Sequence, residues 1–215
     1  MARESTKRPY HHGDLRNALI HAGLQVLARD GVAGLSLRKV AKEAGVSHTA
    51  PYRHFTDKDA LLAAIALDGF NLLAARLQRA HEENQDDPEE MLLDAGVGYI
   101  KLAVSKPDTV RLMFGGMLQM EKVGQEAEKS RSAGVDCQDP KMAYEGLHNI
   151  VTYGQGAGAF KEGEPRDWAL LLWSCVHGLA MLVSADQLRD APQSEEEIEA
   201  LTRRICRLML QGMLK

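Results

Sequence analysis

A short polar and basic segment near the N-terminus carries the kinds of side chain that contact nucleic acids. The segment from Ser47 to His54 reads SHTAPYRH. Small and polar side chains can reach base edges in a groove of DNA, and Tyr, Arg and His can donate hydrogen bonds to phosphate oxygens. The chemistry indicated is therefore DNA recognition. The candidate contact residues in this segment are His48, Thr49, Ala50, Tyr52, Arg53 and His54.

The residues around this segment predict two short helices joined by a tight turn. Ser36 can cap a first helix that ends before Gly45, which suits a left-handed turn. Ser47 can cap a second helix that runs to about His54, and Pro51 should stiffen its first turn. This arrangement is a helix-turn-helix, whose second helix enters the major groove of DNA.

A third helix is predicted to begin directly after the recognition helix. The segment Thr56 to Asp59 has the capping-box pattern, with Thr56 as the capping residue. It places Lys58 and the free N–H groups of a helix N-terminus beside the recognition helix. Both features favour the binding of a phosphate group.

The run GVSHTAPYRHFTDKDALL resembles the end of the DNA-binding domain of TetR-family transcriptional regulators. The resemblance extends back through GLSLRKVAKEAG and covers about Tyr10 to Leu62. Pro51 departs from many members at the centre of the recognition helix. The resemblance implies an all-α protein in which one set of residues faces DNA: Arg38, His48, Thr49, Ala50, Tyr52, Arg53, His54 and Lys58.

The distribution of charge agrees with binding of DNA at one end of the molecule. The net charge of the 215 residues is −4. Residues 1–58, however, contain ten Lys and Arg against five Asp and Glu, whereas residues 59–215 contain sixteen against twenty-five. A basic head on an acidic body is therefore expected. Residues 1–9 are predicted to be a disordered basic arm, residues 10–58 the DNA-binding domain, and residues 59–215 a helical body.

Apolar periodicity and Pro, Gly and Asp breaks predict about nine helices in total. The expected helices after the recognition helix cover residues 57–83, 89–105, 109–113, 141–160, 165–183 and 195–213. A charged helix within 117–133 is also expected. Residues 168–183 form the most apolar segment. Their length falls short of the roughly 20 residues of a membrane span, so a helix buried on nearly all sides is predicted.

Residues 90–190 resemble more loosely the WHG-type ligand-binding domain of the same family. The resemblance depends on Trp173, His177 and Gly178 and on the run RLMFG at residues 111–115. The last two predicted helices are apolar, which suggests a four-helix interface between two copies. The TetR-family resemblance likewise implies a homodimer that reads a palindromic operator, and a cavity in the body for an unidentified small-molecule effector. The candidate ligand-binding residues are Phe70, Met113, Phe114, Met117, Tyr144, His148, Trp173 and His177. Ordinary core packing is the alternative for each of them, and His177 could simply hydrogen-bond a neighbouring helix.

Other classes of function find less support in the sequence. Paired-carboxylate, HExxH, GxSxG and Walker motifs are absent, so no catalytic, metal or cofactor site is predicted. His11 and His12 are adjacent and point apart on a helix. The three cysteines are widely spaced, and with the lack of an apolar leader they predict a cytoplasmic protein with reduced thiols. A repressor released by its ligand is the main expectation. An activator, and a DNA-binding redox sensor switched through Cys137, stay open.

Overall fold

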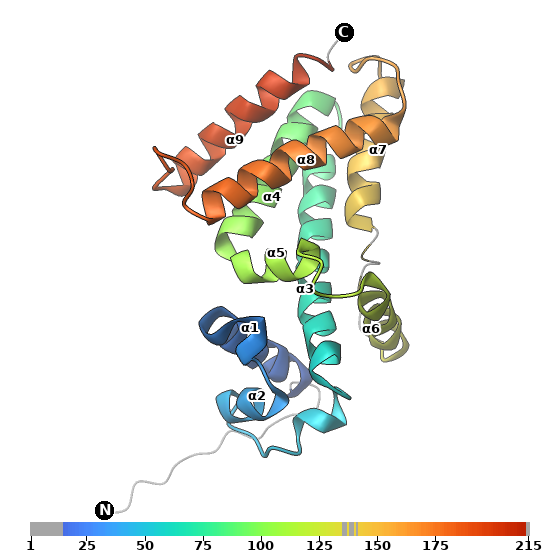
Figure 1. The fold of residues 1–215 in the computed structure, drawn as a ribbon. Coiled ribbons are helices and arrows are strands. Elements are labelled where there is room, and N and C mark those ends of the chain that lie inside the picture. The colour runs from blue at the N-terminus through green and yellow to red at the C-terminus, as the bar shows by residue number, and fades with distance from the viewer. Residues whose placement is uncertain (1–14, 135–136, 138–139, 141, 214–215) are drawn as a thin grey trace, which may run out of the picture. The chain divides into compact units, whose positions relative to one another are not determined.

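The computed structural model describes residues 15–134, 137, 140 and 142–213. The proposed arm at residues 1–9 and the pair His11 and His12 lie outside these residues. The described part of the chain confirms the all-α prediction, with nine α-helices and one short 3₁₀-helix. In chain order (Figure 1) they are α1 Leu15–Gly34, α2 Leu37–Glu43, η1 Pro51–Arg53, α3 Lys58–Glu83, α4 Pro88–Ser105, α5 Pro107–Phe114, α6 Met120–Ser132, α7 Met142–Gly156, α8 Pro165–Ser184 and α9 Glu195–Leu210.

Most helix starts are decided by capping residues and prolines. The side chains of Ser36, Asp87 and Ser194 accept hydrogen bonds from backbone N–H groups three residues further on, at 3.3, 3.0 and 3.2 Å. Each satisfies a donor that the first turn of a helix leaves unpaired. Prolines occupy the first position of α4, α5 and α8, where the missing N–H costs nothing. These signals are local, which is why the sequence located the starts well.

The chain divides into two compact units, Met1–Ile65 and Ala66–Lys215, and α3 contains the division. We call the first unit the head and the second the body. The core of the head consists of fully buried side chains from α1, α2, α3 and the segment before α3. They include Leu19, Val26, Val40, Phe55, Leu61 and Ile65. Gly31 has a φ of 67° and interrupts α1, which continues to Gly34, and Gly45 makes the predicted left-handed turn with a φ of 68°.

The second helix of the predicted helix-turn-helix does not form as a regular α-helix. The chain makes a turn from Ser47 to Ala50 and then one turn of 3₁₀-helix, η1. Pro51 has no N–H to donate to the Ser47 carbonyl. That carbonyl instead accepts a 3.0 Å bond from Ala50, and the Arg53 N–H bonds to the Ala50 carbonyl at 3.2 Å. Pro51 thus changes the kind of helix, and the prediction that it merely stiffens an α-helix is wrong.

Two predicted caps in the head are also placed differently. The Ser47 hydroxyl forms a 3.2 Å hydrogen bond with the Thr49 hydroxyl. At the start of α3, Asp57 and not Thr56 is the capping side chain, because the Ala60 N–H donates to its carboxylate at 2.8 Å. The carboxylate is charged and lies at the positive end of the helix dipole, which favours Asp57 as the cap.

In the body, α4 lies against α7, α8 and α9. Met91, Ile100 and Leu102 of α4 are fully buried. The contact between α4 and α9 also contains an ionic cluster centred on Arg203. Its guanidinium pairs with Glu90 and Asp94 of α4 and, at 3.1 Å, with Glu199 of its own helix. Such a cluster fixes which face of α9 meets α4.

Helix α8 begins at the predicted Pro165 and ends one residue beyond the predicted range, but its burial differs from the prediction. Only Ala169, Leu172, Val176 and Ala180 are buried along it. By length and composition, α8 and α3 are each apolar enough to cross a membrane, and the most apolar stretch of α3 is 61% buried against 28% for that of α8. The prediction that α8 is buried on nearly all sides is therefore wrong for a single chain. Leucines at 170, 171 and 182 stand about half exposed on its outer face.

Glycines permit two close approaches in the body. A side chain at Gly69 of α3 would overlap Met113 and Thr109 of α5, so this glycine lets the two helices pack closely. A side chain at Gly154 of α7 would overlap the ring of Phe160, which is fully buried. The residue that approaches Gly154 lies in the segment after α7.

Candidate functional site

The predicted DNA-contacting side chains in the head lie mostly at its surface. Tyr52 is 54% exposed despite its large ring. The exposed members of the set are Arg38, His48, Thr49, Tyr52 and Arg53, and the half-buried members are Ala50, His54 and Lys58. An exposed aromatic hydroxyl beside exposed basic groups fits phosphate and base-edge contacts better than it fits a folded core.

The rest of η1 is fixed to the head by apolar side chains. Pro51 and Phe55 are buried on either side of the exposed Tyr52 and Arg53. The Arg16 guanidinium lies over the Phe55 ring, 5.6 Å from its centroid. This anchoring holds η1 in place, so that its outward side chains are presented from a rigid base.

Lys58 occupies a more structural position than the sequence suggested. Its ammonium donates a 2.5 Å hydrogen bond to the Val32 carbonyl, in the last turn of α1 after the kink at Gly31. An ammonium has three donors, so a phosphate contact by Lys58 stays a prediction. Its bond to Val32 gives it a second, structural role within the head.

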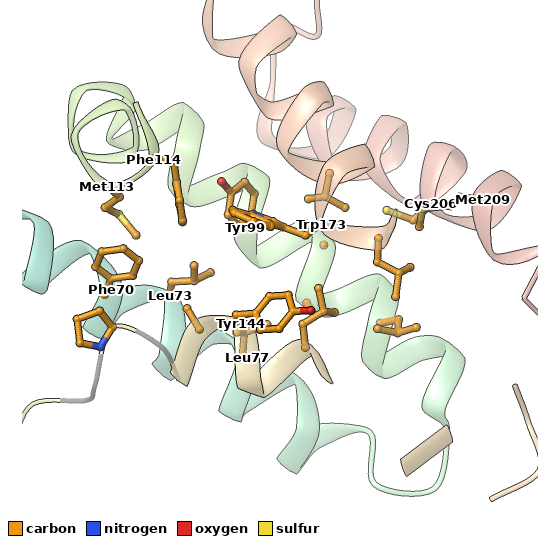
Figure 2. A pocket seen from close by; sticks show the side chains of 18 of the residues that line it. Phe70, Leu73, Leu77, Tyr99, Met113, Phe114, Tyr144, Trp173, Cys206 and Met209 are labelled. Carbon is orange, nitrogen blue, oxygen red and sulfur yellow. The ribbon is translucent and has the colours of Figure 1, made fainter. Parts of the chain in front are cut away.

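The body contains a cavity of about 410 Å³ that draws its wall from seven helices and the segments after α5 and α6. Figure 2 shows how side chains from distant parts of the chain surround it. The residues that line it are Phe70, Leu73, Leu77, Leu92, Ala95, Gly96, Tyr99, Met113, Phe114, Gly116, Leu118, Met120, Pro140, Ala143, Tyr144, Leu147, Leu172, Trp173, Val176, Cys206, Met209 and Leu210. Its size falls in the range of pockets that hold small organic molecules.

Five of the eight candidate ligand-binding residues come together in this wall. They are Phe70, Met113, Phe114, Tyr144 and Trp173. Met117, His148 and His177 are not part of the lining, and Met117 is 55% exposed. The sequence reasoning missed the contributions of α4 and α9, such as Tyr99 and Cys206. Both lie on helices whose apolar faces read simply as core, and only their position opposite α8 reveals the cavity.

The aromatic rings form a connected series along the cavity. The centroid of Phe114 lies 5.6 Å from that of Phe70 and 5.4 Å from that of Trp173, in edge-to-face geometry. Trp173 in turn lies 6.5 Å from Tyr144. Edge-to-face pairs are favourable because the positive edge of one ring meets the negative face of the next. The series therefore links α3, α5, α7 and α8 around one space.

Tyr99 and His177 make a polar contact at the edge of this apolar space. The Tyr99 hydroxyl lies 2.7 Å from Nδ1 of His177, which joins α4 to α8. Burial raises the pKa of Tyr99 well above its usual value, and a hydrogen bond with Trp173 offsets this only in part. Burial also lowers the pKa of His177. Both side chains are therefore neutral near pH 7, so the contact is an uncharged hydrogen bond.

The cysteines do not present a reactive thiol at the surface. Cys137 is buried, and its Sγ donates to the Ala127 carbonyl at 3.2 Å. Burial raises the pKa of Cys206 to about 11 and also raises the pKa of Cys175. Since the thiolate is the reactive form, raised pKa values and burial disfavour oxidation. The redox alternative, which depended on Cys137 being accessible in a loop, loses that basis.

Residues 19–65 match the model of the family described as bacterial regulatory proteins, tetR family. The chain is 29% identical over 118 residues to the regulator Rv1816 of Mycobacterium tuberculosis, which is 54% of this chain and 49% of that protein. It is 31% identical over 144 residues to the class A tetracycline repressor of transposon 1721 from Escherichia coli. That match covers 66% of this chain and 64% of the repressor. These matches span about half to two thirds of the relatives' length.

Among solved structures, a protein of unknown function from Rhodococcus sp. RHA1 is similar along nearly the whole chain. It is 33% identical, with a TM-score of 0.76, and the match covers 97% of this chain and 100% of that one. The whole helical architecture, and not only the head, is thus shared with another bacterial protein. With the helix-turn-helix geometry and the matched N-terminal segment, these findings show that the head is a TetR-type DNA-binding domain.

Proposed function

We propose that this protein is a DNA-binding transcriptional regulator, a repressor whose dimer leaves its operator when a small molecule enters the body. The observation that carries the proposal is the pairing of two features in one chain. The head presents Tyr52, Arg53 and Arg38 outward from a helix-turn-helix, and the body encloses a cavity of about 410 Å³. A DNA-binding surface is not expected in an ordinary enzyme. An enclosed cavity is not expected in a DNA-binding protein with a purely structural role.

The dimer is proposed to form through α8 and α9. Their outward leucines, Leu170, Leu171, Leu182 and Leu208, are between 46% and 59% exposed in the single chain. Large apolar side chains gathered on neighbouring helices usually mark an interface. A dimer is also what reading a palindromic operator requires, because its two heads must fit half-sites about 34–36 Å apart or a compatible spacing.

Helix α3 supplies a physical route from cavity to head. Phe70 and Leu73 of α3 line the cavity, and residues 58–65 of the same helix belong to the head. Met113 lines the cavity too, and it packs closely at Gly69. A ligand that moves α5 must therefore move α3 or strain this contact. Linkage requires that the ligand bind the DNA-incompetent state more tightly than the competent one.

We infer that the body is of the WHG type. Phe114, from the run RLMFG, lies 5.4 Å from Trp173 and 5.6 Å from His177, ring centroid to ring centroid. Both stretches that carry the resemblance thus meet at the cavity. This contact supports the inference because a shared ligand site would explain why these residue types occur together.

The test is fluorescence anisotropy with labelled DNA from upstream of the gene, at moderate salt and with the dimer verified by light scattering. We expect saturable binding that unlabelled specific DNA removes and scrambled DNA does not. An intact dimer that binds both DNAs equally would overturn the proposal. A promoter-reporter assay then gives the sign of regulation, since a repressor raises expression when deleted and an activator lowers it.

A further inference from the structure

The wall of the cavity in the body is apolar and uncharged. None of the described residues that line it is Asp, Glu, Lys, Arg or His. A charged ligand would have to leave water without a counter-charge, which is strongly unfavourable. The lining therefore disfavours carboxylates, phosphates and ammonium compounds, however well their apolar parts fit.

The composition of the wall favours a ring over a flexible chain. Phe70, Phe114, Tyr144 and Trp173 supply aromatic surface, and Met113, Met120 and Met209 supply polarisable sulfur. Both kinds of side chain make favourable contacts with an aromatic ligand. A volume of about 410 Å³ lies near the lower end of the range for small-molecule sites, which suits a compact molecule of two or three rings.

Polar groups on the wall are few, and they are not equally available. The Tyr144 hydroxyl donates to the Arg166 carbonyl at 3.3 Å, and the Cys206 thiol is a weak hydrogen-bonding group. The Tyr99 hydroxyl is different, because its partner His177 has two tautomers. The tyrosine oxygen also accepts a hydrogen bond from Trp173. If Nδ1 accepts, the oxygen keeps its second lone pair for a ligand donor; if Nδ1 carries the proton, the tyrosine O–H donates to a ligand acceptor.

We propose that the cavity takes a neutral, compact aromatic molecule bearing one hydroxyl or carbonyl oxygen, and that this oxygen hydrogen-bonds to Tyr99. The Tyr99–His177 pair sets the position of the ligand, and the aromatic wall supplies most of the buried area. The proposal rests on the proposed function in assuming that the cavity is an effector site. It goes further in stating the chemical class of the effector.

The test uses four probes built on one ring system: naphthalene, 2-naphthol, 2-acetonaphthone and 2-naphthoate. Binding to the full chain is measured by isothermal titration calorimetry at pH 7. We expect 2-naphthol or 2-acetonaphthone to bind about five-fold more tightly than naphthalene, because one net hydrogen bond strengthens binding by about that factor. We expect 2-naphthoate to bind at least about ten-fold more weakly than the tighter of these two. Equal or tighter binding of the carboxylate, or no binding of any neutral probe, would overturn the proposal.

Two tyrosine variants provide a matched comparison within the cavity wall. Tyr99→Phe removes the hydroxyl that pairs with His177, and Tyr144→Phe removes the one that donates to a backbone carbonyl. We expect the advantage of the oxygen-bearing probes over naphthalene to vanish in Tyr99→Phe and to persist in Tyr144→Phe. If the oxygen-bearing probes keep their tighter binding in both variants, Tyr99 does not hold the ligand. Naphthalene affinity in both variants reports whether the cavity is intact.

Probe binding and DNA binding, measured on the same protein, distinguish a failure of this proposal from a failure of the proposed function. If a neutral probe binds as expected but DNA affinity does not change, the ligand class stands and the regulatory coupling fails. If the DNA is bound specifically and no neutral probe binds, the regulator stands and the ligand class fails. An Ala143→Trp variant, which fills the cavity from a half-buried position, should abolish binding of every probe that truly enters it.

Discussion

The head and the body differ in where their functional polar side chains lie. In the head, Arg38, Tyr52 and Arg53 stand at the surface on a base of buried apolar residues. In the body, Tyr99 is buried, His177 and Arg203 are half-buried, and all three are bonded to side chains of another helix. Surface side chains can meet a highly charged partner in water. Enclosed ones discriminate by shape and by single hydrogen bonds, so the two units suit DNA and a small neutral molecule respectively.

The comparison predicts that changes in the body act on stability and those on the head surface act on DNA binding. The largest expected effect is that of Gly154→Ala. The added methyl group would overlap the buried ring of Phe160, so we expect a loss of about 3 kcal/mol in the free energy of unfolding. Urea denaturation followed by circular dichroism measures it.

Gly156→Ala is the matched control, because no heavy atom lies within 4 Å of its added Cβ. There we expect no loss, or a gain of up to about 1 kcal/mol from better helix propensity. Equal losses of stability in the two variants would mean that alanine destabilises α7 for a reason other than contact with Phe160.

Arg38→Ala should weaken DNA binding without unfolding the head. We expect a loss of about 1–3 kcal/mol in binding free energy if the side chain reads a base, and a fall of about 1 in the salt slope if it contacts phosphate. Anisotropy titrations over a range of salt concentrations distinguish the two. Arg29→Ala removes the same charge from an arginine that pairs with Glu43 and Asp30, and it should leave the affinity nearly unchanged.

Ser36→Ala tests whether the head depends on its local signals. Its hydroxyl caps α2 by accepting the Lys39 N–H at 3.3 Å, and loss of such a cap costs about 1 kcal/mol. Thermal unfolding of the full chain should show the loss in the transition assigned to the head. A destabilised body with an unchanged head would contradict the division into two units.

The smallest expected effect concerns pH and His177. Burial lowers the pKa of this imidazole in the folded state, whereas in the unfolded chain it is about 6.5. As pH falls below about 6.5, the unfolded chain takes up the proton first, so stability is lost from there down to the folded pKa. His177→Gln should reduce this slope below about pH 6.5. Urea midpoints of the original protein and of the variant are measured over this pH range. If the two midpoints fall in parallel as the pH is lowered, His177 does not contribute to the pH dependence of stability.

Helix positions were predictable where the determining interactions lie within a few residues of each other. The starts of α4, α5 and α8 follow from prolines and acidic or polar residues that act within one turn. The turn at Gly45 follows from the freedom of that residue to adopt a positive φ. Pro51 shows the limit, because its missing N–H has a known effect but the sequence alone did not decide between a stiffened α-helix and a 3₁₀-helix.

The cavity residues were predictable only in part, because residue type does not reveal what lies opposite a helix face. Phe114 and Trp173 were proposed from their resemblance and chemistry, whereas Tyr99 belongs to the site through its bond to His177, 78 residues away. Cys137 shows the same difficulty in reverse, since a residue expected in a loop is buried against α6.

The all-helical fold and the basic helix-turn-helix head could be predicted from residue order, since caps, apolar period and local charge are properties of neighbouring residues. Which side chains enclose the cavity, and which face of α8 is left exposed, became known from the packed helices. Those outcomes depend on packing between segments that are far apart in the chain, and pairwise proximity of that kind is not encoded in any local pattern.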